Sequence, residues 1–191
     1  MNEKWTISKE FNFEMGHRVW SQKLDHAHLS LSTECACKHL HGHSYSIKVN
    51  LEAKHLDNSS MVTDFKNLNF VKEFLDSTLD HKFMLDVNDP NFDLITGVKA
   101  VSEPVINFTN LYDYIWDFNY FDDRTKTHIK SFVLVNFVPT SENICKYLKQ
   151  HFQEKIGYIA KVSAVELWET KKSYCRYEDI KNEYIISKVS I

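Results

Sequence analysis

The sequence lacks the long apolar segments that would mark a membrane protein or a secreted precursor. No apolar run approaches the roughly 18 to 20 residues that span a bilayer, and the N-terminus has no apolar signal-peptide region. It also lacks an excess of charge of either sign, because the formal net charge is only -3, which disfavours a nucleic-acid-binding surface. Only four cysteines occur in 191 residues, and a chain of this length needs no disulfides. These absences predict a cytoplasmic protein with reduced thiols, without a membrane segment or a nucleic-acid partner.

The composition has no break that would separate two domains. Hydrophobic residues make up 43% of the chain and aromatic residues 14%, which is enough to fill one core. We therefore expect a single domain over residues 1–191. Within it, residues 91–130 are rich in aromatic side chains but have no clear period. We interpret them as an insertion with its own apolar cluster, acting as a lid or an oligomer contact.

The most unusual stretch is Cys35–His43, which holds two cysteines and three histidines within nine residues. His41 and His43 begin a run in which polar and apolar residues alternate as far as Leu51, as in a half-buried strand. Successive side chains of a strand point to opposite faces, so both histidines lie on the face that also carries Tyr45. Two imidazoles therefore end the core-facing side of this predicted strand.

A second predicted strand, residues 5–17, offers a third imidazole. Its odd positions are mostly apolar, and His17 continues that face. If the two strands pair antiparallel, the end of the first meets the start of the second, and His17 approaches His41 and His43. Three histidines with an open fourth position are the ligand set of a catalytic zinc ion. His17 considered alone is more typical of a hydrogen-bonded core histidine.

A different metal site is also compatible with this stretch. Cys35, Cys37, His39 and His41 could form a closed structural site. Its spacings are tighter than those of the usual structural zinc motifs, which makes this arrangement the less favoured of the two.

The remaining periodicity predicts helices and further strands. Asp64 is a good N-cap for a helix over about residues 65–78. Pro139-Thr140-Ser141-Glu142, with a hydroxyl cap, is the start signature of a second helix that ends before Gly157. Three further strands are predicted, over residues 131–138, 160–170 and 174–186. Antiparallel strands with helices packed to one side indicate an α+β fold. Between the first helix and the insertion, Asp80 and His81 are a candidate proton-handling pair, since a carboxylate can orient and charge an imidazole.

Six short motifs occur in one order outside the insertion. They are Gly16-His17-Arg18, Cys37-x-x-x-His41-Gly42-His43, Val62-Thr63-Asp64-Phe65, Leu79-Asp80-His81, Pro139-Thr140-Ser141-Glu142, and Glu169-Thr170 followed by Cys175. In this order they resemble the 6-pyruvoyl- and 6-carboxy-tetrahydropterin synthase family. The resemblance implies the tunnelling fold, a four-stranded antiparallel sheet with two helices on one face. It also implies a homohexamer in which sheets close into barrels, with active sites at subunit interfaces.

The resemblance further implies roles for individual residues. His17, His41 and His43 would bind Zn2+, and Cys37 would be the catalytic thiolate, with a pKa lowered by the metal and an imidazole. Asp80 and His81 would form a relay. Substrate binding would fall to Glu169, which anchors the pterin, and to Thr140, Ser141 and Glu142. Glu166 is an alternative to Glu169, and Lys171 and Lys172 are candidates for binding the triphosphate.

The implied reaction is the zinc-dependent conversion of 7,8-dihydroneopterin triphosphate to 6-carboxy-5,6,7,8-tetrahydropterin, acetaldehyde and triphosphate. It would be an early step toward queuosine and other 7-deazapurines. One alternative is 6-pyruvoyl-tetrahydropterin synthesis in the tetrahydrobiopterin pathway. Others are aldolase-like cleavage of dihydroneopterin and a non-catalytic, zinc-stabilised binding module.

Overall fold

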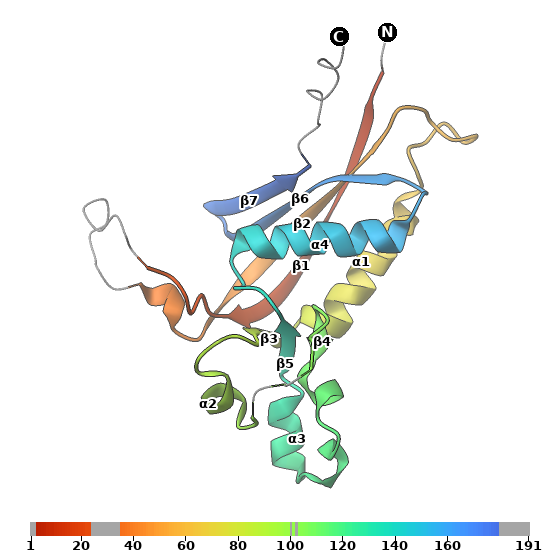
Figure 1. Ribbon diagram of the computed structural model, residues 1–191. Coiled ribbons are helices and arrows are strands. Elements are labelled where there is room, and N and C mark those ends of the chain that lie inside the picture. Colours follow the sequence, from red (N-terminus) through yellow and green to blue (C-terminus); the bar gives the residue numbers. More distant parts are fainter. Residues whose placement is uncertain (1–2, 24–34, 100, 102, 180–191) are drawn as a thin grey trace, which may run out of the picture.

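The computed structural model describes residues 3–23, 35–99, 101 and 103–179 (Figure 1). In this part of the chain, seven strands form one sheet in the order β4-β5-β3-β1-β2-β6-β7. The strands are β1 Trp5–His17, β2 His41–Ala53, β3 Lys82–Asp86, β4 Thr109–Asn110, β5 Phe132–Val135, β6 Lys161–Thr170 and β7 Ser173–Glu178. The α-helices are α1 Asn69–Phe74, α2 Phe92–Thr96, α3 Asp123–Ile129 and α4 Ser141–Ile156. The mixture of sheet and helices agrees with the predicted α+β class.

The sheet is larger than the predicted four strands. The antiparallel set β1, β2, β6 and β7 is present, but β3 continues the sheet beyond β1 through a short parallel pairing at Met15 and Gly16. Strand β5 pairs parallel with β3, and β4, which comes from the insertion, pairs antiparallel with β5. Strand β3 has no polar and apolar alternation, because its last three residues are all buried. A short strand of this kind gives no period-2 signal.

One face of the sheet and two helices enclose the main core. Figure 1 shows α1 and α4 crossing the same face. Alternate residues of β1 and β2 point into this core, among them Phe13, Tyr45 and Ile47, and α4 contributes Leu148 and Phe152. The alternation therefore has the predicted parity, and His17, His41 and His43 lie at the end of this core-facing row.

The predicted helix over residues 65–78 is not one regular α-helix. A 3-10 turn covers Phe65–Leu68, α1 follows, and a π turn covers Leu75–Leu79. The predicted N-cap is confirmed, because the Asp64 carboxylate accepts a hydrogen bond from the Lys66 amide at 2.7 Å. Phe65 is half exposed and does not belong to the buried stripe. The π turn closes with the Asp80 amide donating to the Leu75 carbonyl, which brings Asp80 to the edge of β1.

The insertion has an apolar cluster of its own, as predicted. Phe92 and Leu111 from the insertion pack with Ile129 and with Leu85 and Leu134, which lie on the faces of β3 and β5 turned away from the main core. In Figure 1 the insertion, which includes α2 and α3, lies at one end of the molecule, next to β3 and β5. The insertion thus packs on β3 and β5 and adds β4 to the sheet.

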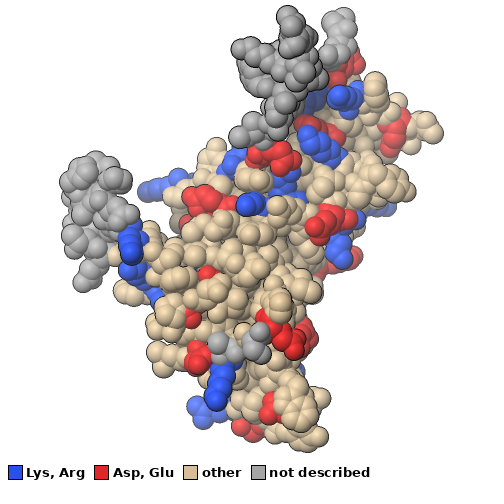
Figure 2. Space-filling model, viewed as in Figure 1, with Lys and Arg blue, Asp and Glu red and all other residues tan. Residues whose placement is uncertain are grey.

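The C-terminal half follows the predicted order with shorter strands. Strand β5 is shorter than residues 131–138, and β7 ends at Glu178, while residues 180–186 of the predicted last strand lie outside the described residues. The Thr140 hydroxyl caps α4 as predicted, accepting from the Asn143 amide at 3.3 Å. Among the described residues, no helix is both long and apolar enough to cross a membrane. Acidic and basic side chains are intermingled on the face shown in Figure 2, so neither sign dominates it.

Candidate active site

Three imidazoles meet where β1 ends and β2 begins. His17 pairs directly with His41 in the antiparallel register, and His43 lies opposite Met15. The potential ligand atoms of the three histidines all lie within 4.8 Å of one another. The ring centroids are 4.5 to 5.2 Å apart. The strand register thus produces a cluster compact enough to hold one metal ion.

Backbone carbonyls fix the orientation of two of these rings. His17 Nδ1 lies 2.7 Å from the Pro139 carbonyl oxygen, and His41 Nδ1 lies 2.8 Å from the His39 carbonyl oxygen. A carbonyl oxygen only accepts, so both Nδ1 atoms carry the proton, and in the neutral form of each ring the lone pair lies on Nε2. His17 Nε2 is buried and has no hydrogen-bond partner among the described residues. An orphaned imidazole nitrogen of this kind fits a metal ligand.

Glycines allow β1 and β2 to approach closely at this point. Gly16 and Gly42 lie opposite each other, next to the His17–His41 pair. A Cβ atom on Gly42 would lie 3.0 Å from the Met15 carbonyl oxygen, and one on Gly16 would lie 2.5 Å from Cδ2 of Phe83. The missing side chain at Gly42 therefore lets β2 approach β1 closely, and the missing side chain at Gly16 leaves room for Phe83 of β3.

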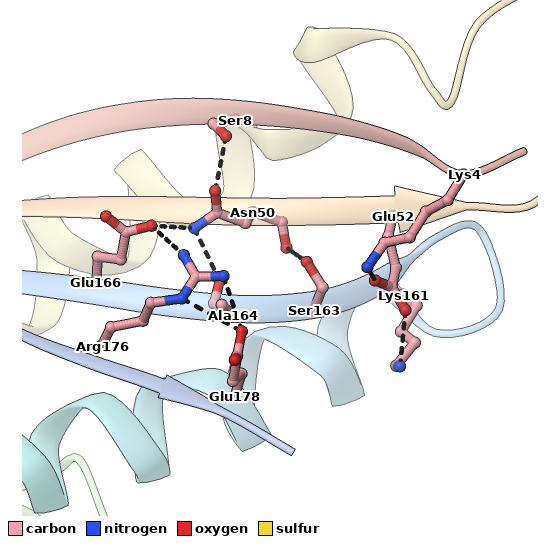
Figure 3. Close-up of polar contacts among 10 residues, drawn as sticks. All are labelled: Lys4, Ser8, Asn50, Glu52, Lys161, Ser163, Ala164, Glu166, Arg176 and Glu178. Atoms are coloured by element: carbon pink, nitrogen blue, oxygen red, sulfur yellow. Dashed lines mark hydrogen bonds and ion pairs between the residues drawn. The ribbon is translucent and has the colours of Figure 1, made fainter. Parts of the chain in front are cut away.

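Glu169 reaches the cluster from β6. Its Oε1 lies 3.9 Å from His17 Nε2, and its side chain is one quarter exposed. The alternative residue, Glu166, lies on the opposite face of the sheet, where it accepts from Asn50 Nδ2 at 3.0 Å and binds Arg176 (Figure 3). The two residues have opposite parity in β6, because Leu167 beside Glu166 faces the main core. The geometry therefore places Glu169, and not Glu166, at the candidate site.

Cys37 lies in a 3-10 turn, Ala36–Lys38, just before β2. Its carbonyl accepts from the Val19 amide at 2.8 Å, which ties the turn to the residues that follow His17. Burial raises the pKa of the Cys37 thiol, and the neighbouring Cys35 thiol and the Glu169 carboxylate raise it further. These protein groups therefore oppose the thiolate, and the lowering of the pKa expected from a bound metal ion stays a prediction.

Known proteins resemble this chain over nearly its full length. A sequence model of the 6-pyruvoyl tetrahydropterin synthase family matches residues 6–179. The chain belongs to that family. A 6-carboxy-5,6,7,8-tetrahydropterin synthase from Aquifex aeolicus (strain VF5) is 32% identical over 188 residues, covering 92% of this chain and 99% of that protein.

Solved structures agree with the fold of the 6-pyruvoyl tetrahydropterin synthase family. An uncharacterized protein from Wolinella succinogenes is 37% identical with a TM-score of 0.82, covering 93% of this chain and 99% of that one. The Caenorhabditis elegans 6-pyruvoyl tetrahydropterin synthase is 22% identical with a TM-score of 0.55, over 93% of this chain and 97% of that one. At that identity the likeness establishes the fold alone.

The Asp80–His81 pair of this family member is formed, but makes no hydrogen bond or ion pair with the imidazole cluster among the described residues. Asp80 Oδ2 lies 2.9 Å from His81 Nδ1, and Asp80 Oδ1 accepts from the Glu14 amide at 2.8 Å. The His81 side chain is 79% exposed. Within the described residues, neither side chain hydrogen-bonds or ion-pairs with Cys37 or with the three clustered histidines. One copy of the chain therefore does not bring the predicted relay into contact with the predicted thiolate.

The predicted closed site of Cys35, Cys37, His39 and His41 is not formed. The described residues contain a single cluster suited to a metal, and it includes only His41 of these four. The Cys35 thiol instead donates to Gln22 Oε1 at 2.5 Å. His39 contributes its carbonyl oxygen, and not its ring, to the orientation of His41. The sequence reasoning missed the carbonyls of Pro139 and His39, because a backbone acceptor leaves no signal in residue type.

The remaining predicted substrate residues lie at the start of α4 and in the turn between β6 and β7. Thr140, Ser141 and Glu142 begin α4 immediately after Pro139, whose carbonyl holds His17, so this helix start adjoins the cluster. The Thr140 hydroxyl is engaged as the helix cap. Lys171 and Lys172 form the exposed turn between β6 and β7, which follows Glu169. Two further histidines, His26 and His28, lie outside the described residues.

Acid should destabilise the metal-free protein through His17, which is buried, and His43, which is partly buried. Burial lowers the pKa of His17, and burial also lowers the pKa of His43. Below the unfolded value of about 6.5 the unfolded chain binds more protons than the folded one, so the unfolding free energy should fall as the pH drops from about 7.5 to about 5.5. Urea unfolding of the metal-free protein at both pH values measures this fall. His17→Gln should reduce the pH dependence, and an equal pH dependence in that variant would contradict the assignment.

Proposed function

We propose that the protein is a zinc-dependent lyase of the 6-carboxy-tetrahydropterin synthase type. It would convert 7,8-dihydroneopterin triphosphate to 6-carboxy-5,6,7,8-tetrahydropterin, acetaldehyde and triphosphate, toward queuosine and other 7-deazapurines. The observation that carries the proposal is the cluster of three imidazoles, one with an orphaned buried Nε2, beside the carboxylate of Glu169. The relative from Aquifex aeolicus, whose name states the carboxy product, supports this branch.

The donor set supports zinc as the metal of this site. Three neutral imidazoles with an open fourth position suit Zn2+. A histidine ligand usually hydrogen-bonds through its other ring nitrogen, and backbone carbonyls accept these hydrogen bonds from His17 and His41. When bound, the ion would polarise the side-chain hydroxyls of the substrate and acidify the adjacent C–H group. Because the ligand atoms come from two paired strands, the site is set by the rigid sheet.

Each remaining residue has a role that its chemistry permits. In this proposal Cys37 accepts the proton from the substrate side chain, and Glu169 binds the guanidine-like pair of N–H groups on the pterin through its two oxygens. Asp80 accepts from His81 Nδ1, so the outer nitrogen of His81 is free to exchange a proton. Thr140, Ser141 and Glu142 at the start of α4 would contact the substrate, and Lys171 or Lys172 would bind the triphosphate.

A homohexamer would complete this arrangement. The sheet leaves most of β1 unpaired on the side of β3, since that pairing covers only Met15 and Gly16, and β7 is the opposite edge. Free edges of this kind favour pairing with further copies. We propose that a neighbouring copy brings its Asp80 and His81 to the Cys37 of this one, which would explain why the pair lies apart from the thiol within one chain.

Product identification tests the proposed reaction. The zinc-loaded protein is incubated with 7,8-dihydroneopterin triphosphate, with the metal-free protein as the control, and the products are identified by mass spectrometry. We expect 6-carboxy-tetrahydropterin and acetaldehyde in equal amounts, and neither from the control. The name of the matching family favours the pyruvoyl reaction as a second candidate. Formation of 6-pyruvoyl-tetrahydropterin without acetaldehyde would assign the protein to that branch, and unchanged substrate would exclude both reactions.

A further inference from the structure

Tyr45 carries a buried hydroxyl group that no protein group satisfies. The residue is 1% exposed, and its hydroxyl oxygen has no hydrogen-bond partner among the described residues. Its ring stacks on Phe13, with centroids 5.1 Å apart and planes within 10° of parallel, which fixes the side chain. An unpaired hydroxyl in a core costs free energy, and phenylalanine would avoid this cost in the same space. The Tyr45 hydroxyl therefore lacks, among the described residues, the hydrogen-bond partner that would offset the cost of its burial.

The Tyr45 ring lies against the imidazole cluster. It meets the ring of His43 edge-on at 5.5 Å between centroids and the ring of His17 at 6.0 Å. On the other side of β2, Ser46 pairs with Trp168, so Tyr45 adjoins Glu169 in the next strand. Two imidazoles and a carboxylate of the candidate site thus surround the residue. His17 Nε2, on the same face of the sheet, is likewise buried without a partner among the described residues.

We propose that Tyr45 is a positioning residue whose hydroxyl donates a hydrogen bond to an oxygen atom of the molecule held at the metal centre. The inference rests on the proposed metal site and deepens the proposed function. A phenol can donate to such an oxygen, and the exclusion of water from this buried position strengthens the bond. Because Phe13 holds the ring by stacking, this donor would restrict how the substrate side chain lies with respect to Cys37.

Ligand binding by the Tyr45→Phe variant tests the inference without requiring turnover. The probe is acetohydroxamate, a small ligand that presents oxygen atoms to zinc, and its dissociation constant is measured by calorimetry on the zinc-loaded protein. We expect the variant to keep its zinc and to bind the probe roughly tenfold more weakly, the loss that one hydrogen bond accounts for. Tyr147→Phe is the matched control, since Tyr147, a partly buried tyrosine, is likewise stacked on a phenylalanine, Phe137. It should bind the probe as the wild type does.

Thermal stability separates a positioning role from a structural one. Removing an unpaired buried hydroxyl should leave the melting temperature of the metal-free protein unchanged or raise it. Unchanged probe affinity, loss of zinc, or a lowered melting temperature in Tyr45→Phe would each overturn the inference, as would a zinc-loaded wild type that does not bind the probe. If the wild type binds the probe and Tyr45→Phe weakens it, but no pterin product forms, the proposed reaction fails while the role of Tyr45 stands.

Discussion

Replacing Cys37 with alanine should lower kcat by about 10²- to 10⁴-fold, the usual contribution of a proton-transfer residue. The side chain is only partly buried and belongs to none of the hydrogen bonds that hold the imidazole cluster together. The variant should therefore keep its fold and its zinc. Steady-state turnover of dihydroneopterin triphosphate, with zinc content measured on the same sample, tests this expectation.

Cys35 provides a matched control two residues earlier. Its thiol donates to Gln22 and does not belong to the metal cluster, so Cys35→Ala should retain most of the activity. Full turnover in Cys37→Ala would remove the thiolate from the reaction and favour a non-catalytic binding module. A large loss in Cys35→Ala with none in Cys37→Ala would assign the proton transfer to the other thiol.

Replacing His17 with alanine should abolish tight zinc binding. His17 is 1% exposed, and its ring is held through Nδ1 with Nε2 toward the cluster. Losing only the group that hydrogen-bonds to a metal ligand weakens metal affinity by about 10- to 100-fold. Losing the ligand itself should therefore weaken zinc affinity by more than about 100-fold. Zinc per chain after dialysis against a chelator measures this change. The rise in melting temperature that zinc gives the wild type should also disappear.

His39 is the control for His17. Only its carbonyl oxygen takes part in the site, so His39→Ala should bind zinc as tightly as the wild type. If His39→Ala lost zinc while His17→Ala kept it, the ion would belong to the cysteine-containing closed site after all.

Much of the candidate site follows from local rules. Strand side chains alternate, so the apolar rows of residues 5–17 and 41–51 suffice to place His17, His41 and His43 on one face. Antiparallel pairing then requires the end of one strand to meet the start of the other. The caps at Asp64 and Thr140 are equally local, because a short oxygen-bearing side chain before a helix satisfies its first amides.

Other features depend on contacts between distant segments. Strand β3 is short and buried, so only its pairing with β1 and β5 defines it. The π turn ends at Asp80, where the Glu14 amide donates to the Asp80 carboxylate and the His81 amide donates to the Glu14 carbonyl. Glu14 lies far from both residues in the sequence, so these contacts depend on the tertiary fold. The raised pKa of Cys37 follows only in part from its neighbour Cys35, since burial and the Glu169 carboxylate, which come from the fold, also oppose the thiolate.

The sequence by itself determined which strand face carries the three histidines, because side-chain alternation is a property of the backbone. Only the tertiary structure decided that Glu169 rather than Glu166 reaches them, since this depends on how β6 registers against β2. It alone also left Tyr45 without a partner among the described residues and the Asp80–His81 pair away from Cys37. Such outcomes arise from packing between elements, which no local pattern encodes.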